Sequence, residues 1–301
     1  MALSIPPSLK LIDLRLLAQK CGLQTSGTKP ILAQRIGHAL SSIPKLPPDT
    51  RILSIDMGIR NLAYCILDVP AAPRLLRSPS KIQPSLHAWQ RLSLSRAPQN
   101  GEIESFSPAT LSSLAYKLLR HRLLPEKPSY ILIERQRFRS MGSKHILEWT
   151  VRVNMLEAVI YGILCALKEE GVWEGEVLGI APGKVGPFWV EDGEERGVWK
   201  KERTAKKKNK GLKIDLVRGW LEDGQMVSLG NGEVEAMAKR YIEKWDRTPG
   251  GRKLEAEGEE MGKLDDLADC LLQGMAWIQW QENKNVALQH GVEALLDQCH
   301  E

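Results

Sequence analysis

The chain has 301 residues, a formal net charge of +5 and a sequence pI near 8.9. Hydrophobic residues make up 43% and charged residues 26%, values typical of a folded globular protein that exclude a disordered, collagen-like or coiled-coil chain. The most apolar run, residues 158–167, is too short to cross a bilayer, so we expect a soluble protein with no membrane partner. Five scattered cysteines without a C-x-x-C pair favour a reducing compartment and argue against a structural zinc site.

Residues 8–43 are predicted to form two helices joined by a polar turn, because leucine and isoleucine recur at helical spacing on both sides of residues 22–29. Gly22 suits the end of the first helix, and Thr28 followed by Pro30 suits the start of the second. The segment resembles a SAP module, a small helical DNA-binding motif, through Leu14, Arg15, Ala18, Gly22, Leu23, Gly27, Lys29, Leu32 and Arg35. That resemblance implies DNA binding through Lys29, Arg35 and the helix amino termini. The alternative is a plain helical hairpin that docks on the main domain.

Residues 44–50 contain three prolines and are predicted to be a stiff linker between a module of residues 1–43 and a large domain of residues 51–301. In the large domain, apolar runs bounded by turn signals predict strands at 51–57, 62–69, 85–94, 129–133 and 177–181. Helical periodicity predicts helices at 108–124, 145–169 and 264–281. This order predicts an α/β fold of the RNase H-like type, with a mixed five-stranded sheet flanked by helices, beside the small SAP-like module.

Acidic residues stand at two predicted strand ends and on one face of the last helix. Asp56 ends an apolar strand, and Glu134 occupies the same position on another. Asp269 lies four residues after Asp265 and three after Asp266, so either pair shares a helix face. Each acid alone has an ordinary explanation as a helix cap, a turn residue or an ion-pair partner. The joint pattern instead predicts one acidic site.

Carboxylates brought together repel one another and take up protons unless a cation neutralises them. Oxygen ligands without nearby histidine or cysteine favour Mg²⁺ or Mn²⁺ over zinc. Two such ions can activate a water and stabilise the leaving 3′ oxygen in phosphodiester hydrolysis. We therefore expect two Mg²⁺ (or Mn²⁺) ions per active site, no small-molecule cofactor and no nucleophilic side chain.

Residues 54–63 (SIDMGIRNLA), 133–140 (IERQRFRS) and 263–269 (KLDDLAD) resemble the fungal mitochondrial Holliday junction resolvases, cruciform-cutting relatives of RuvC. The resemblance spans residues 51 to about 281, and a SAP-like segment also belongs to that family. It implies that Asp56, Glu134, Asp269 and one of Asp265 or Asp266 are the catalytic metal ligands. It also implies a mitochondrial homodimer that nicks two strands of a four-way DNA junction symmetrically.

Basic residues cluster beside these acids and in the run 200–213, where eight lysines and arginines accompany a single acid, Glu202. Taken alone, such a run is explained as well by a solvated loop or a localisation signal as by contact with nucleic acid. Given the resemblance, we expect DNA contacts from Lys29, Arg35, Arg60, Asn61, Arg135, Gln136, Arg137, Arg139, Ser140, Lys144, Lys206, Lys207, Lys208, Lys210 and Lys213. The long helix from 145, with Trp149 exposed, is expected to form a self-complementary dimer interface. Residues 183–199 depart from a minimal core, and their role stays open.

Three other functions fit parts of the pattern. A DEDD-type exonuclease shares the fold and the metals, but it opens with D-x-E, whereas Asp56 is followed by Met57 and Gly58. An actin-like ATPase also opens with D-x-G, but it needs glycine-rich phosphate loops that the sequence lacks. A non-catalytic branched-DNA-binding nucleoid protein is the stronger alternative, and the intact acids argue against it.

Overall fold

A mixed six-stranded sheet forms the centre of the computed structural model, which describes residues 5–42, 47, 49–70, 82–95, 105–136, 146–190, 203–246 and 263–297. Its strand order is β5-β4-β1-β2-β3-β6. The strands are β1 (Thr50–Asp56), β2 (Leu62–Val69), β3 (Ser85–Leu92), β4 (Tyr130–Glu134), β5 (Glu176–Ile180) and β6 (Ser228–Leu229). The first three are antiparallel neighbours, whereas β4 pairs with β1, β5 with β4 and β6 with β3 in parallel. All five predicted strands are confirmed, but the predicted strand count is wrong, because β6 has only two residues and leaves no periodic signal.

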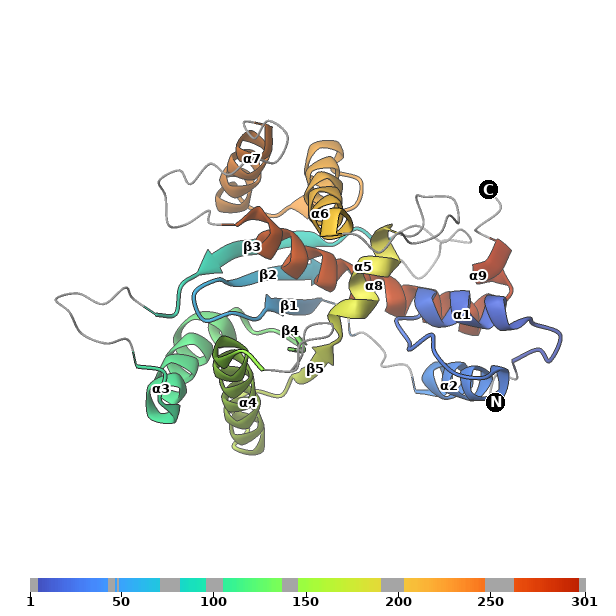
Figure 1. The fold of residues 1–301 in the computed structure, drawn as a ribbon, viewed down its shortest axis with the longest axis horizontal. Coiled ribbons are helices and arrows are strands. Elements are labelled where there is room, and N and C mark those ends of the chain that lie inside the picture. Colours follow the sequence, from blue (N-terminus) through green and yellow to red (C-terminus); the bar gives the residue numbers. More distant parts are fainter. Residues whose placement is uncertain are drawn as a thin grey trace.

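Helices cover both faces of the sheet (Figure 1). On one face lie α3 (Pro108–Leu118) and α4 (Glu148–Glu169). On the other lie α5 (Pro182–Val190), α6 (Arg203–Asp223), α7 (Gly232–Asp246) and α8 (Leu264–His290). The helix predicted at 108–124 continues after α3 as a π-helical turn (Leu119–Leu123) and a short 3-10 helix (Leu124–Glu126). The last helix runs nine residues beyond its predicted end at 281, and the basic run predicted as a DNA-binding track lies largely in α6.

Side chains alternate between the two faces of β1, and this alternation builds two separate cores. Ile52 belongs to the core cluster on the side of α8, whereas Leu53 and Ile55 belong to the cluster on the side of α3 and α4. A strand buried on both faces reads as a continuous apolar run, which explains why the sequence signal for β1 and β4 is strong.

The helix α4 is long and apolar enough to cross a membrane by length and composition, and it is the one such helix among the described residues. Core helices of soluble proteins pass the same test, and α4 buries Val153, Leu156 and Ile160 against the sheet. Its outward face is unusual for a core helix, because Val151 there is 45% exposed. Trp149 lies on a different side of the helix, where its ring contacts Phe106 and Arg60. The outward face of a core helix in a soluble protein is usually polar, so apolar residues on this face of α4 call for an explanation.

The amino-terminal helices α1 (Leu11–Lys20) and α2 (Lys29–Ser41) lie at the far end of α8, beside α9 (Ala294–Asp297) (Figure 1). Their core includes Ala287, Val292 and Leu295, so residues from both ends of the chain build it. As predicted, Gly22 follows the first helix in the left-handed conformation (φ +67°), where a side chain would also collide with the Trp280 ring. Thr28 precedes α2 as predicted, but its side chain makes no capping hydrogen bond.

Candidate active site

Asp56 and Glu134 are the last residues of two neighbouring parallel strands, β1 and β4. The register pairs Ile55 with Ile133, so the next residues along both strands come level at the same edge of the sheet. The two carboxyl groups lie close together: after burial, the neighbouring Glu134 is the next cause of the raised pKa of Asp56. The expectation that two strand ends bring acids together is therefore met.

The helix α8 carries the remaining acids across the sheet. One turn beyond Asp269, the buried amide of Gln273 donates to the Ser54 hydroxyl (3.0 Å) and to the carbonyl of Ile55 (3.2 Å). At the next residue, Gly274, a Cβ atom would lie 3.2 Å from the Cβ of Ser54. This close approach holds the first turns of α8 directly over the end of β1.

The pKa values of three acids report their crowding. Burial raises the pKa of Asp56 well above its usual range, and the hydrogen bond and charge of Glu134 and the charges of Asp269 and Asp266 add to the effect. Burial, followed by the charge of Asp265, raises the pKa of Asp266 to about 6. Burial also raises the pKa of Asp269. Side chains separated by about two hundred positions in the sequence thus share one electrostatic environment.

Three cations of the chain itself lie against these acids. The Lys213 ammonium is 2.6 Å from Asp269 Oδ1, and Lys210 pairs with Asp265. Arg91 Nε is 3.6 Å from Asp266 Oδ2, which is too long for a hydrogen bond. Asp266 Oδ2 is buried and accepts no hydrogen bond within the part of the chain that the structure describes.

The residues fit a divalent cation, because a buried carboxylate oxygen without a donor and crowded acids of raised pKa both gain from one. Within the described ranges, however, no three acids, histidines or cysteines already form a closed ligand set. Lys210 and Lys213 of the chain itself instead pair with two of the acids, Asp265 and Asp269. A divalent cation here would replace these lysine contacts.

Four predicted DNA-contacting residues lie close to the acids. The Arg60 guanidinium sits 5.2 Å from the centre of the Trp149 ring, and Asn61 Oδ1 accepts a hydrogen bond from Arg91. The Arg135 side chain lies over β5 beside Gly179, and the Gln136 backbone N–H donates to Glu157 (3.2 Å). These four positions border the site, whereas Lys210 and Lys213 enter it.

The other predicted DNA contacts are less well placed or lie outside the described residues. Lys29 donates to the Pro7 carbonyl (2.8 Å), and Arg35 donates to the carbonyls of Gln24 and Ser26, so both brace their own module. Lys206, Lys207 and Lys208 belong to α6, but only their backbone is described. The predicted contacts outside the described residues are Arg137, Arg139, Ser140 and Lys144.

The segment at 183–199 is described only as far as α5, which ends at Val190. In α5, the Trp189 indole donates to the Leu272 carbonyl of α8 (3.0 Å), and the Lys184 ammonium donates to the Gly22 carbonyl (2.8 Å). This part of the insertion therefore joins α8 to the amino-terminal helices.

Sequence reasoning missed three residues at the site. Gln273 left a usable signal, since it is a polar residue on an otherwise apolar helix face, four positions after Asp269. Glu157 lies near Glu134 and has a pKa raised first by burial, but nothing in the sequence separates it from a surface acid. Arg91 reaches Asp266 only because β3 pairs with β2, which the sequence does not specify.

The strand order, the acids at two strand ends and the acids on α8 define an RNase H-like α/β protein with a carboxylate site. Comparison with known proteins narrows the class. A family model described as "Mitochondrial resolvase Ydc2 / RNA splicing MRS1" matches residues 52–287, and the chain belongs to this family.

Similar proteins match over three quarters or more of the chain. The chain is 28% identical over 282 residues to the mitochondrial cruciform cutting endonuclease 1 of Schizosaccharomyces pombe, covering 91% of this chain and 93% of the relative. Identity to the Saccharomyces cerevisiae protein of the same name is 27% over 257 residues, covering 77% and 69%. The solved structure of the yeast mitochondrial Holliday junction resolvase Ydc2 superimposes with a TM-score of 0.59 at 28% identity, covering 97% of this chain and 98% of that one.

Proposed function

We propose that this protein is a divalent-metal-dependent endonuclease that resolves four-way DNA junctions by paired nicking. The observation that carries the proposal is the meeting of Asp56, Glu134, Asp266 and Asp269 at one end of the sheet. The relatives named cruciform cutting endonuclease, and the Holliday junction resolvase with a similar fold, supply the substrate class. The family description also names RNA splicing, so family membership alone does not decide between the two activities. The carboxylate site is what favours the nuclease.

In this proposal, Asp56, Glu134, Asp269 and Asp266 hold two Mg²⁺ (or Mn²⁺) ions. Divalent cations in such a site supply Lewis-acid stabilisation of the phosphate and of the leaving oxygen. We favour Asp266 over Asp265, because the charge of Asp266 acts on Asp56 and its Oδ2 is buried without a hydrogen bond. Asp265 then serves as the partner of Lys210.

The chain's own residues do the positioning. Lys213 and Lys210, which pair with Asp269 and Asp265, would contact the phosphates of the strand when cations occupy the acids. Arg60, Asn61, Arg135 and Gln136 border the same edge and would fix the strand's register. DNA contacts by the remaining basic residues, including Lys29 and Arg35 of the amino-terminal module, stay predictions, as does the division at 43 and 50.

Two active sites are needed to nick a two-fold junction, and the exposed face of α4 offers a surface for a second copy. Along this face Val151, Ala158, Gly162 and Ala166 are exposed and recur at helical spacing. Small residues allow two helices to approach closely, and an isologous contact would place the two sites symmetrically. The proposal is completed by this homodimer and by a mitochondrial location; the word "mitochondrial" stands in the names of both relatives.

The test compares the purified chain on a labelled four-way junction, a linear duplex of the same sequence and its single strands, with Mg²⁺ and with EDTA. We expect paired nicks in the junction alone, and only with Mg²⁺. The Asp56→Asn variant should bind the junction but leave it intact, because it loses a metal ligand and keeps the lysines and arginines that contact phosphates. The matched control is Asp223→Asn, an exposed aspartate at the end of α6, which should nick normally.

Each outcome separates the candidate functions. Junction binding without nicking by the unmodified chain would overturn the enzyme and favour the non-catalytic junction-binding alternative. Nicking that is equal on duplex and junction would remove the junction specificity but keep the nuclease.

A further inference from the structure

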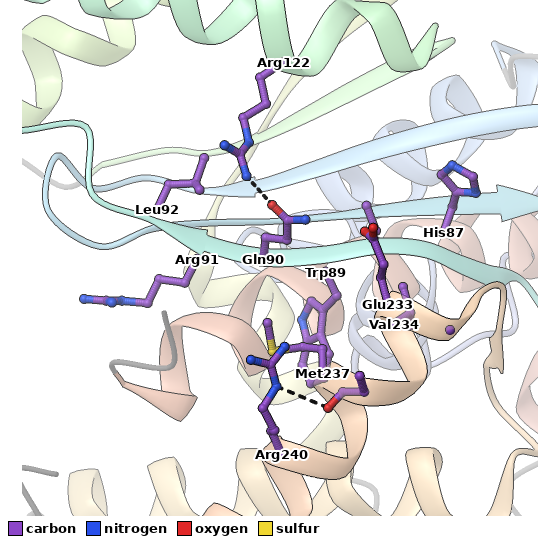
Figure 2. Close-up of a pocket in the computed structure, with 13 residues that line it drawn as sticks. His87, Trp89, Gln90, Arg91, Leu92, Arg122, Glu233, Val234, Met237 and Arg240 are labelled. Atoms are coloured by element: carbon purple, nitrogen blue, oxygen red, sulfur yellow. Dashed lines mark hydrogen bonds between the residues drawn. The ribbon is translucent and has the colours of Figure 1, made fainter. Parts of the chain in front are cut away.

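A groove of about 610 Å³ runs along the outer edge of β3, outside the acidic site (Figure 2). One wall is the face of α7 from Gly232 to Arg240, and Arg122 overhangs the other wall. Trp89 and Met237 close the bottom and are both nearly fully buried. We call this feature the β3-edge groove.

The groove exists because β3 is only partly paired on that side. The strand β6 pairs with Ser85 and Leu86 alone, and the next carbonyl, that of His87, accepts from the Asn231 side chain (2.7 Å). The register with β2 also shifts at this point, a bulge that bends the strand. From Ala88 onward, no strand of the described chain continues the sheet beyond β3.

Cations dominate the walls. Arg122 and Arg240 are exposed on opposite sides of the strand, and Arg91 lies at the end of the groove nearest the acids. Glu233 is the one acid among the lining residues. Lys244 adds a fourth cation just beyond, since its pKa is lowered first by burial and then by the charge of Arg91. A concave basic surface of this kind attracts a polyanion.

The groove opens directly onto the acidic site. Arg91 Nε is 3.6 Å from Asp266 Oδ2, and the same guanidinium donates to Asn61, the last residue of the turn between β1 and β2. A chain of phosphates leaving the acids would therefore meet Arg91 first, then Arg240 and Arg122.

We propose that the β3-edge groove binds the sugar-phosphate backbone of a nucleic-acid strand that extends from the phosphate held at the acidic site. The identity of that strand as junction DNA rests on the proposed function; the groove's affinity for a nucleic-acid backbone does not. An open strand edge would also accept a peptide, but three arginines against one glutamate favour phosphates over a peptide backbone.

The test measures binding in EDTA, where no cleavage interferes, by fluorescence anisotropy of a labelled four-way junction and of a labelled single strand. Arg122→Gln with Arg240→Gln removes two groove cations and spares Arg91 and the acids. The matched control, Lys117→Gln with Lys168→Gln, removes two exposed charges from α3 and α4. Between about 50 and 200 mM salt, the groove variant should bind roughly tenfold more weakly, and its logarithmic salt slope should fall by about 1.5 to 2. The control should change neither.

A photo-crosslinking amino acid tests the location directly. At Ala236, an exposed position of the α7 wall, it should capture junction DNA close to the nick positions, whereas at Lys168 it should not. Unchanged melting temperatures of the variants would show that the fold survives. The groove proposal would be overturned if the groove variant had the same affinity and salt slope as the control variant. It would also be overturned if the amino acid at Ala236 captured only protein.

The result is separable from the proposed function. If the unmodified chain nicks junctions with Mg²⁺ and the groove variant binds them normally, the groove proposal fails alone. If Ala236 captures nucleic acid but no junction is ever nicked, the groove stands and the proposed enzyme fails.

Discussion

The amide nitrogen of Gln273 lies 3.0 Å from the hydroxyl of Ser54, two residues before Asp56 in β1, and this contact joins the last helix to the central strand. The same amide reaches the carbonyls of Ile55 and Leu132, on β1 and β4. One buried side chain therefore holds together the three elements that carry the acids.

Replacing Gln273 by leucine should destabilise the protein and misplace Asp269. The substitution leaves the Ser54 hydroxyl buried without its donor, which costs about 1–3 kcal/mol. Urea unfolding should report the lower stability, and nicking should slow even below the melting temperature. Gln279→Leu, which changes a half-buried glutamine of the same helix, should have the smaller effect on both. Equal effects of the two changes would contradict a special role for Gln273.

Gly274→Ala should also destabilise the protein. The added Cβ would lie 2.7 Å from Leu67 Cδ1, and Leu67 is itself fully buried and cannot move aside freely. Overpacking of this kind costs about 1–3 kcal/mol, more than the roughly 1 kcal/mol that alanine gains over glycine in a helix. Gly219→Ala on α6, where no atom lies within 4 Å, is the control and should stabilise. Thermal unfolding compares them, and two stabilising changes would refute the packing argument.

Asp265→Asn and Asp266→Asn should differ in metal affinity. If Asp266 is the ligand, its replacement should weaken Mn²⁺ binding by more than about tenfold in calorimetry, because even outer partners of metal ligands cost that much. Asp265→Asn removes the partner of Lys210 and should weaken binding less. The reverse order of the two affinities would make Asp265 the ligand.

The metal-free protein should lose stability as the pH rises from about 4 to 6. The pKa of Asp266 is raised, first by burial, to about 6 in the folded chain against its ordinary value of 3.8, so unfolding releases a proton in this window. Raising the pH then favours the unfolded state, by about 3 kcal/mol for a shift of this size. The pKa of Asp56 is also raised, first by burial, so this group adds a loss of the same sign.

Urea unfolding in EDTA at several pH values checks this prediction. The Asp266→Asn variant lacks the titrating group, so its free energy of unfolding should fall less. Mg²⁺ should restore the stability of the unmodified protein near pH 7. A fall as steep in Asp266→Asn as in the unmodified protein would assign the effect to other groups.

Gly162→Arg should leave the monomer folded and break the proposed dimer. A side chain at Gly162 meets no atom within 4 Å in the monomer, and arginine is a better helix former than glycine. Light scattering should give the monomer mass for the variant and the dimer mass for the parent, with paired nicks replaced by single ones. A monomeric parent would contradict the α4 interface.

Several sequence predictions hold because their cause is local. The turn at Gly22 and the Pro30 start of α2 follow from backbone preferences of a few residues. The apolar runs of β1 and β4 ending in Asp56 and Glu134 follow from strands buried on both faces. Where the signal is short, as for the two residues of β6, the sequence predicts five strands instead of six. Where it is masked by charge, as for α6, the helix is not predicted at all.

The sequence by itself determined the fold class and which acids form the site. Strand and helix periodicity, and a carboxylate at a strand end, depend only on residues that are neighbours in the chain. Only the tertiary structure decided which side chains meet: that Lys210 and Lys213 lie on the acids, that Arg91 reaches Asp266, and that the β3 edge stays open beside α7. These contacts join residues far apart in the chain, and their geometry depends on strand register and helix packing that no local pattern specifies.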